Sequence, residues 1–296
     1  MATTISQAFL QYALNLEITD RQTSLVSERW KNVVNAVAQE FTLYPTSPSK
    51  LIGSYDRNTL IRYLSEGDVD VMVVLHYGDN QAWHNPEGTI KALDKFRTIL
   101  DKAYPNTEKG RDRNCITMRF TEFRLDVVPA FANESGYYLI PDSIRTLWVS
   151  TDPFSFAERI TTVNEAMGDC FVPLIKMIKG WNRNEGWPLR SFHLECLLYN
   201  HFKNYTVSYS YPYMIKEFFA SLPVYLASYT YDPVKGDQVD SYLDNYAANT
   251  KRQIAIEKAN KAAAKSKEAY EDQDKYVSVA ISEWKDLMGE FFPTYG

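Results

Sequence analysis

Hydrophobic residues recur with helical spacing in two segments near the start of the chain. Ile5 to Leu16 predicts a short helix, and Ser24 to Phe41 predicts a longer one. In the longer segment the apolar positions are three or four residues apart, which gives one stripe that can pack against a sheet. The residues of this stripe are Val26, Trp30, Val33, Val34, Val37 and Phe41.

Strand-like patterns dominate from about residue 51 to residue 140. Val71 to Leu75 is rich in β-branched residues and predicts a buried strand. The same reasoning gives further strands and one intervening helix: strands over Cys115–Phe120, Glu122–Val128 and Tyr137–Ile140, and a helix over Pro86–Ala103. This part of the chain is predicted to form a small mixed sheet packed on helices.

From about Asp152 onward the pattern is helical. Pro153 suits the first turn of a helix that Asp152 can cap. Further helices are predicted through Phe171–Trp181, from Ser191 and around Trp284. Tyr211–Tyr229 is predicted as one helix or as two interrupted by Pro223, and Asp240–Glu271 as a long charged and Ala-rich helix. We therefore predict an α/β plus α fold, with a catalytic lobe and its N-terminal helices in residues 1–150 and a helical lobe in residues 151–296.

Composition narrows the class of protein. The chain has 296 residues, 45% hydrophobic and 23% charged, as expected for an ordinary globular protein. It has no apolar run of about 18 residues and no basic-then-apolar leader, so we expect a cytoplasmic protein without a membrane segment. A net charge of -5 argues against an extended nucleic-acid surface.

A Gly-Ser turn is the first candidate for ligand binding. Gly53 and Ser54 follow the apolar pair Leu51-Ile52 and precede a predicted helix through Leu60, Ile61 and Leu64. Free N–H groups at a helix N-terminus favour phosphate. Glycine allows close approach of the backbone, and Ser54 adds a hydroxyl donor. Both residues are therefore predicted to bind a triphosphate.

Three aspartates are the candidate metal ligands. Asp68 and Asp70 point to one face of a strand, since strand side chains alternate. Asp126 lies on the face opposite Phe123, Leu125 and Val127 in a later strand. Such carboxylates would hold two Mg²⁺ ions, or Mn²⁺ in their place, and thereby catalyse an in-line displacement. A D-x-D pair alone is more often a solvated pair of acids; the order Gly-Ser, D-x-D strand, single-Asp strand favours the metal site.

The same residues carry a resemblance to a known family. Gly53 to Asp70 reads G-S-Y-x-R-x-T-x-I-x-x-x-S-x-x-D-x-D. Later motifs of the same family lie at 178–182 (IKGWN), 191–195 (SFHLE) and 280–293 (AISEWKDLMGEFFP). This pattern resembles the bacterial cyclic-oligonucleotide synthases related to cyclic GMP-AMP synthase, the CD-NTases of CBASS antiphage defence, within the polymerase-β-like nucleotidyltransferase superfamily. Asn58 departs from it, because the family often has Gly there.

The resemblance implies a fold and an activity. The fold is a polymerase-β-like core with a C-terminal helical lobe and the active site in the cleft between them. Nucleoside triphosphates, ATP or GTP with pyrimidine nucleotides as an open alternative, are joined into a cyclic di- or trinucleotide with release of pyrophosphate. The product is a second messenger that activates a separate effector.

Lys179 and Ser191 are assigned by the resemblance alone. Lys176 and Lys179 lie off the apolar stripe of their segment, a position typical of a solvated face, and Ser191 suits an ordinary N-cap. The family uses the lysine and serine at these positions to hold the donor triphosphate. Lys179 and Ser191 are therefore expected to do so here, with Lys176 as second choice.

Two other functions stay open at the level of sequence. A linear, template-independent nucleotidyltransferase would share all three acids. A catalytically silent nucleotide-binding module would be favoured by the loss of one acid, but Asp68, Asp70 and Asp126 are all present.

Overall fold

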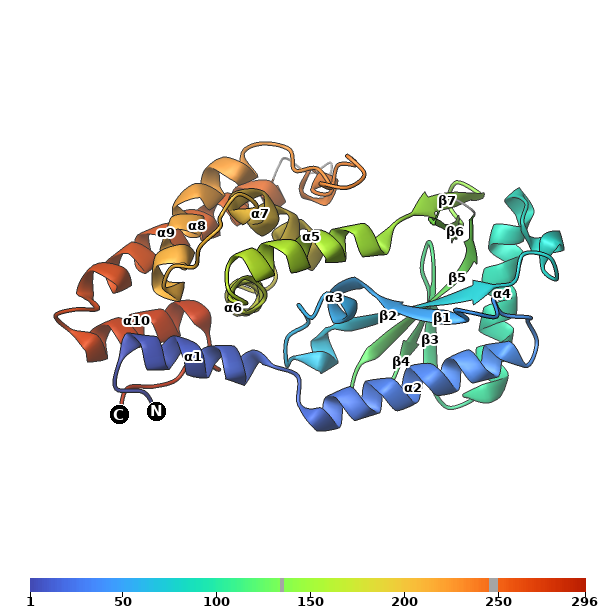
Figure 1. Ribbon diagram of the computed structural model, residues 1–296, viewed down its shortest axis with the longest axis horizontal. Coiled ribbons are helices and arrows are strands. Elements are labelled where there is room, and N and C mark those ends of the chain that lie inside the picture. The colour runs from blue at the N-terminus through green and yellow to red at the C-terminus, as the bar shows by residue number, and fades with distance from the viewer. Residues whose placement is uncertain (134–135, 245–249) are drawn as a thin grey trace. The chain divides into compact units, whose positions relative to one another are not determined.

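A computed structural model describes residues 1–133, 136–244 and 250–296 (Figure 1). The chain forms two compact units. The first, here called the sheet unit, is Ile18–Ser155. The second, the helical unit, combines Met1–Glu17 with Phe156–Gly296.

The sheet unit is built on a mixed sheet, as predicted. Within the described residues it has seven strands, in the order β1-β2-β5-β4-β3, with β6 pairing with β5 and β7 with β6. Only β2 and β5 are parallel; the other pairs are antiparallel. The strands are β1 (Ser49–Ile52), β2 (Asp68–Leu75), β3 (Glu108–Arg111), β4 (Ile116–Arg119), β5 (Arg124–Ala132), β6 (Tyr138–Asp142) and β7 (Leu147–Thr151).

Helices α2 (Asp20–Ala38) and α4 (Pro86–Ala103) pack on one face of this sheet (Figure 1). The core that they share with the sheet contains Val33 and Val37 of α2, Leu93 and Phe96 of α4, and Val69, Val71, Val73, Leu125 and Val127 of the strands. Since strand residues alternate, the even-numbered positions of β2 and β5 point to the opposite face. That face carries all three predicted acids.

Capping groups explain where these two helices begin. Thr19 and Gln22 form a capping box, so α2 starts at Asp20 rather than at the predicted Ser24. The side chain of Asn85 accepts a hydrogen bond from the Gly88 N–H, and Pro86 occupies the first turn. The predicted bounds of α4 are confirmed.

The helix predicted after Gly53 is much shorter than expected. Helix α3 covers only Gly53–Asp56, and a 3-10 turn at Leu64–Glu66 follows. Asn58 adopts φ +53° and turns the chain, after which the N–H groups of Thr59 and Leu60 both donate to the Ser54 carbonyl. Leu60 and Leu64 are buried, as their apolar spacing predicted, but they lie in turns and not in a continuous helix.

Strand β3 was missed because its sequence, EKGR, has no buried position and no apolar pattern. The following strand, β4, pairs with it antiparallel, so backbone pairing forms this strand without an apolar pattern. Strand β7 was missed for a related reason, since none of its residues is fully buried.

The helical unit contains α1 (Ile5–Leu16), α6 (Phe171–Asn184), α7 (Ser191–Phe202), α8 (Tyr211–Leu226), α9 (Thr250–Asp272), α10 (Val277–Met288) and most of α5 (Pro153–Ala166). The predicted start of α5 is confirmed, because the Asp152 carboxylate accepts hydrogen bonds from the N–H groups of Phe154 and Ser155. The predicted helix over Asp240–Glu271 begins only at Thr250; Ser241–Leu243 is a 3-10 turn, and residues 245–249 lie outside the described residues.

The first helix belongs to the helical unit, which differs from the predicted division into residues 1–150 and 151–296. Phe9 packs edge-on against Trp284 and Phe292, with ring centroids 5.1 and 5.0 Å apart. The Tyr12 hydroxyl donates to the Met288 carbonyl at 2.8 Å. These contacts join residues near the two ends of the chain, so no local sequence pattern could predict them.

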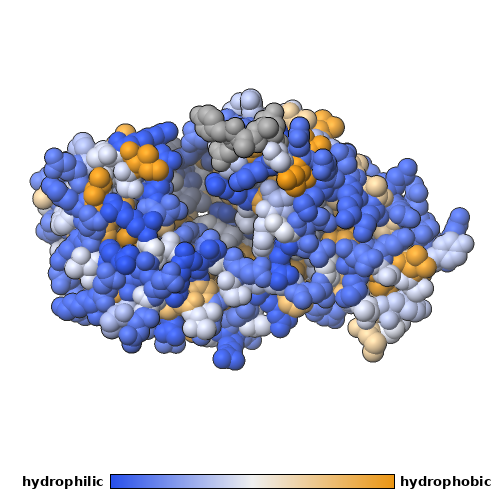
Figure 2. All heavy atoms as spheres, turned by 180° about the vertical axis from the view of Figure 1, so that it is seen from behind, coloured by the Kyte–Doolittle hydropathy of each residue, from blue (hydrophilic) through white to orange (hydrophobic). Residues whose placement is uncertain are grey.

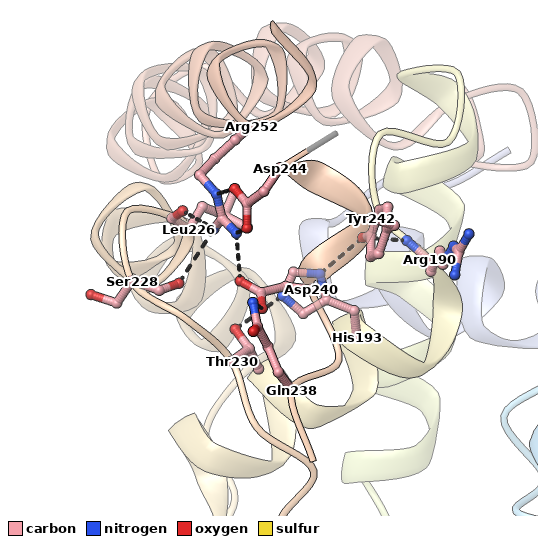
Figure 3. Close-up of polar contacts among 10 residues, drawn as sticks. All are labelled: Arg190, His193, Leu226, Ser228, Thr230, Gln238, Asp240, Tyr242, Asp244 and Arg252. Carbon is pink, nitrogen blue, oxygen red and sulfur yellow. Dashed lines mark hydrogen bonds and ion pairs between the residues drawn. The ribbon is translucent and has the colours of Figure 1, made fainter. Parts of the chain in front are cut away.

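A buried polar network fastens the segment after α8 (Figure 3). The two imidazole nitrogens of His193 contact the hydroxyls of Tyr242 and Thr230 at 2.9 and 3.0 Å. Arg252 forms ion pairs with Asp240 and Asp244, at 2.8 and 2.6 Å. Burial lowers the pKa of His193 to about 4, so this side chain is neutral at pH 7.

The surface is largely hydrophilic on the face shown in Figure 2, where apolar atoms occur in separate small groups. Among the described residues, no helix is long and apolar enough to cross a membrane.

Candidate active site

The sheet brings Asp70 and Asp126 side by side. In the parallel pair of β2 and β5, Asp70 lies directly opposite Asp126. Ile52 of β1 lies opposite Asp70 on the other side, and Thr117 of β4 opposite Asp126. Asp68 lies two positions before Asp70 on the same face. The three acids therefore lie on one face of the sheet, as predicted.

Gly53 lies directly against this row. Its φ is +73°, and a Cβ atom at this position would come within 2.2 Å of the Asp70 carboxylate oxygen Oδ2. Only glycine combines that backbone angle with this contact. The Gly-Ser turn therefore reaches the aspartates, although the four residues of α3 do not form the longer helix on which the phosphate prediction relied.

Burial and mutual repulsion destabilise the charged form of the carboxylates. Burial, followed by the charges of Asp126 and Asp68, raises the pKa of Asp70 to about 7. Burial and Asp126 also raise the pKa of Asp68, against the opposing effect of Arg124. Oxygen Oδ1 of Asp126 is buried and accepts no hydrogen bond. A bound cation would relieve the repulsion and give the unpartnered oxygen a ligand, so these residues fit a divalent metal.

The three carboxylates are not gathered into a finished metal site. Among the described residues, no group of three or more His, Cys, Asp or Glu side chains is arranged to hold a metal ion. Asp68 instead pairs with Arg124, whose Nε lies 2.6 Å from its Oδ1. A cation that binds through all three acids would compete with Arg124 for Asp68.

Arg124 is the residue at the site that sequence reasoning missed. It lies opposite Asp68 in the register of β2 and β5. Its position two residues before Asp126 already places it on the same face of the strand, which was an available signal. The register that joins it to Asp68 was not available from the sequence.

Lys179 and Ser191 lie in the helical unit. Lys179 is only 2% exposed, and its Nζ is 2.5 Å from Oε1 of Glu195, which is itself fully buried. Lys176 is also buried, paired with Glu17 at 2.6 Å. The spacing-based expectation of a solvated face is therefore wrong for both lysines. Ser191 is the first residue of α7 and not its N-cap, which is Arg190.

Sequence comparison identifies relatives of the chain. Residues 3–164, more than half of it, match the family model for the Second Messenger Oligonucleotide or Dinucleotide Synthetase domain. A cyclic AMP-AMP-AMP synthase from an Acinetobacter strain is 29% identical over 82% of this chain and 72% of its own length. A probable cyclic nucleotide synthase from Bacillus cereus is 27% identical over 100% of this chain and 99% of its own length.

Solved structures share the fold. CdnC from Escherichia coli with ATP has a TM-score of 0.72 at 18% identity, over 97% of this chain and 98% of that one. The cyclic AMP-GMP synthase DncV from Vibrio cholerae has a TM-score of 0.74 at 13% identity, over 96% and 97% of the two chains. The predicted polymerase-β-like fold is confirmed. With its acids in register across the sheet and its family match over residues 3–164, the chain belongs to the Second Messenger Oligonucleotide or Dinucleotide Synthetase family and is a nucleotidyltransferase that makes cyclic oligonucleotides.

Proposed function

We propose that this enzyme joins nucleoside triphosphates into a cyclic di- or trinucleotide at a site formed by Asp68, Asp70 and Asp126. The observation that carries the proposal is the register that sets Asp70 beside Asp126, with Gly53 against Asp70. ATP is the first substrate to test, since one relative is named a cyclic AMP-AMP-AMP synthase and the CdnC structure contains ATP. GTP is the second, because it is present with a further structural neighbour.

Asp68 and Asp70 would hold two Mg²⁺ ions at the proposed site, and Asp126 would hold one of them. When bound, such ions supply charge stabilisation to the attacking and leaving oxygens of an in-line displacement. The raised pKa of Asp70 means that protons compete with cations for its carboxylate near pH 7.

The side chains have distinct roles in this proposal. The carboxylate of Asp126, beside the ion that it would hold, is suited to help remove the proton of the attacking hydroxyl. The oxygen of that hydroxyl forms a bond to the α-phosphorus of a second nucleotide, and the bond to pyrophosphate breaks. A second displacement of the same kind closes the ring. Gly53 and Ser54 contact the triphosphate through backbone N–H groups and a hydroxyl. Lys179 and Ser191 bind the donor triphosphate in this proposal, for which Lys179 has to leave its buried pair with Glu195.

The proposed cellular role is based on the names of two further relatives. Two Escherichia coli proteins that match about half of this chain are named CBASS oligonucleotide cyclases. We propose that the product of this enzyme is likewise a second messenger of antiphage signalling, made in the cytoplasm and recognised by a separate effector.

The test is the double substitution Asp68→Ala/Asp70→Ala, assayed with all four nucleoside triphosphates and Mg²⁺ or Mn²⁺. Pyrophosphate release should fall about 10³-fold or more, because charge stabilisation at the reacting phosphorus is lost. Mass spectrometry after phosphatase treatment identifies the product of the unsubstituted enzyme. A resistant cyclic product supports the proposal, whereas linear products indicate a linear nucleotidyltransferase.

A matched control is Asp94→Ala/Asp101→Ala. It also removes two carboxylates, but from exposed positions on α4, where they pair with Arg111 and Arg97. This control should retain its turnover. Persistent turnover in Asp68→Ala/Asp70→Ala would contradict the assignment of the acids.

A further inference from the structure

We propose that Arg124 is a positioning residue that holds Asp68 while the site contains no metal, and that a divalent cation must displace it to bind. The inference rests on the proposed function, because it takes Asp68 as a metal ligand. It assigns Arg124 a role in metal binding without making it a ligand.

The register of the sheet fixes this pair. Asp68 and Arg124 are directly opposite each other in β2 and β5, two positions before Asp70 and Asp126. The guanidinium Nε lies 2.6 Å from Oδ1 of Asp68. A second contact, from a terminal guanidinium nitrogen to the Glu66 carbonyl at 3.3 Å, keeps Arg124 beside the start of β2. Its positive charge thus lies against the carboxylate of Asp68.

The pair has the properties of a contact that can be exchanged. Both side chains are partly exposed, 45% for Asp68 and 38% for Arg124. Nε itself is buried, and its N–H is poorly aligned with Oδ1, so the attraction is mainly one of charge. Partly exposed pairs of this kind contribute little stability. A divalent cation attracts a carboxylate more strongly than a guanidinium can.

The next strand supplies a second arginine that does not hold Asp68. Arg119 of β4 lies opposite Arg124, and its Nε pairs with Glu108 of β3 at 3.2 Å. The two arginines have equal charge and similar exposure, and they occupy neighbouring positions in one cross-strand row. Substitution of Arg119 therefore tests the effect of losing one positive charge near the site, separately from the loss of the ion pair between Arg124 and Asp68.

The experiment measures Mn²⁺ binding to the nucleotide-free protein by the electron paramagnetic resonance signal of free Mn²⁺. The Arg124→Gln protein should bind Mn²⁺ about two- to fivefold more tightly than the unsubstituted protein, because no ion pair has to be broken. Arg119→Gln should give less than half of this change. Arg124→Lys keeps the charge and should remain close to the unsubstituted protein.

The outcomes separate this inference from the proposed function. If the unsubstituted protein binds Mn²⁺ and Asp70→Ala abolishes the binding, the metal assignment stands. Unchanged or weaker binding by Arg124→Gln would then overturn the role of Arg124 alone, and so would an equal gain in Arg119→Gln. Absence of any Mn²⁺ binding by the unsubstituted protein would overturn both.

A second readout does not depend on affinity. The Nε–H resonance of Arg124, identified by its loss in Arg124→Lys, should shift when Mg²⁺ is added, because the guanidinium leaves Asp68. A resonance that stays unchanged at saturating Mg²⁺ would contradict the displacement, even if Arg124→Gln binds the metal more tightly.

Discussion

Position 53 shows how one residue can decide the geometry of the site. The backbone of Gly53 has φ +73°, and the missing side chain leaves space that the Asp70 carboxylate occupies. A side chain here would both strain the backbone and push against the carboxylate. The glycine is therefore tied to the position of Asp70 as well as to the turn.

Substitution Gly53→Ala should displace the Asp70 carboxylate, because the new Cβ would lie 2.2 Å from Oδ2. We expect pyrophosphate release to fall about 10²-fold, as is typical when a reacting group is misplaced by about 1 Å. Steady-state rates at saturating ATP and Mg²⁺ measure this.

Gly136→Ala is the matched control for Gly53→Ala. Gly136 has φ +83° in the same unit, but nothing lies within 4 Å of its would-be Cβ. This variant should lose about 1 kcal/mol of stability from backbone strain and keep its activity. An equal loss of activity in both variants would show that backbone strain, rather than contact with Asp70, explains the effect of Gly53→Ala.

Among the elements, α1 and α6 meet through an unusually close contact. A Cβ at Gly180 of α6 would lie 2.0 Å from the Tyr12 hydroxyl and 3.2 Å from its Cζ. Tyr12 is fully buried, and its hydroxyl donates to the Met288 carbonyl at 2.8 Å. Glycine inside a helix is unfavourable by about 1 kcal/mol relative to alanine. It is retained here because it lets the two helices approach.

Gly180→Ala should destabilise the protein by about 1–3 kcal/mol, since overpacking outweighs the gain in helix propensity. Tyr12→Phe should cost about 1 kcal/mol through the lost hydrogen bond. The double variant should be more stable than the sum of the two losses predicts, because the nearest remaining atom is Cζ at 3.2 Å. Urea denaturation of the four proteins measures the coupling; strictly additive losses would contradict this contact.

For the whole molecule, the two units differ in how the chain builds them. The sheet unit is one continuous segment, Ile18–Ser155, whereas the helical unit needs both ends of the chain. Phe9 is buried against Trp284 and Phe292, so the helical unit lacks part of its core without α1. The two units should therefore respond differently to truncation.

Fragment 18–155 should fold by itself, with a cooperative thermal transition in circular dichroism, because its core is complete. Fragment 156–296 should be unstable alone and should regain a cooperative transition when peptide 1–17 is added. The matched control is the same peptide with Phe9→Ala, which should fail because loss of a buried Phe costs about 3–5 kcal/mol. If fragment 156–296 is equally stable without the peptide, α1 is not part of its core.

The sequence alone predicted the chemistry of the site and determined its local strand geometry. The alternation of side chains along a strand placed Asp126 on one face and Phe123, Leu125 and Val127 on the other. Those three residues are buried as predicted. The apolar spacing alone predicted the bounds of α4, which the structure confirms. These features depend on neighbours a few residues apart, so they can be recognised in a single sequence.

Tertiary structure decided which residues meet. The register of β2 and β5 sets Asp70 opposite Asp126 and Asp68 opposite Arg124. Packing also buried Lys179 beside Glu195 and joined α1 to α10. Such contacts depend on the free energy of packing and pairing over the whole fold, and local spacing does not encode them. The sequence thus identified the acids, and the fold determined how they are held.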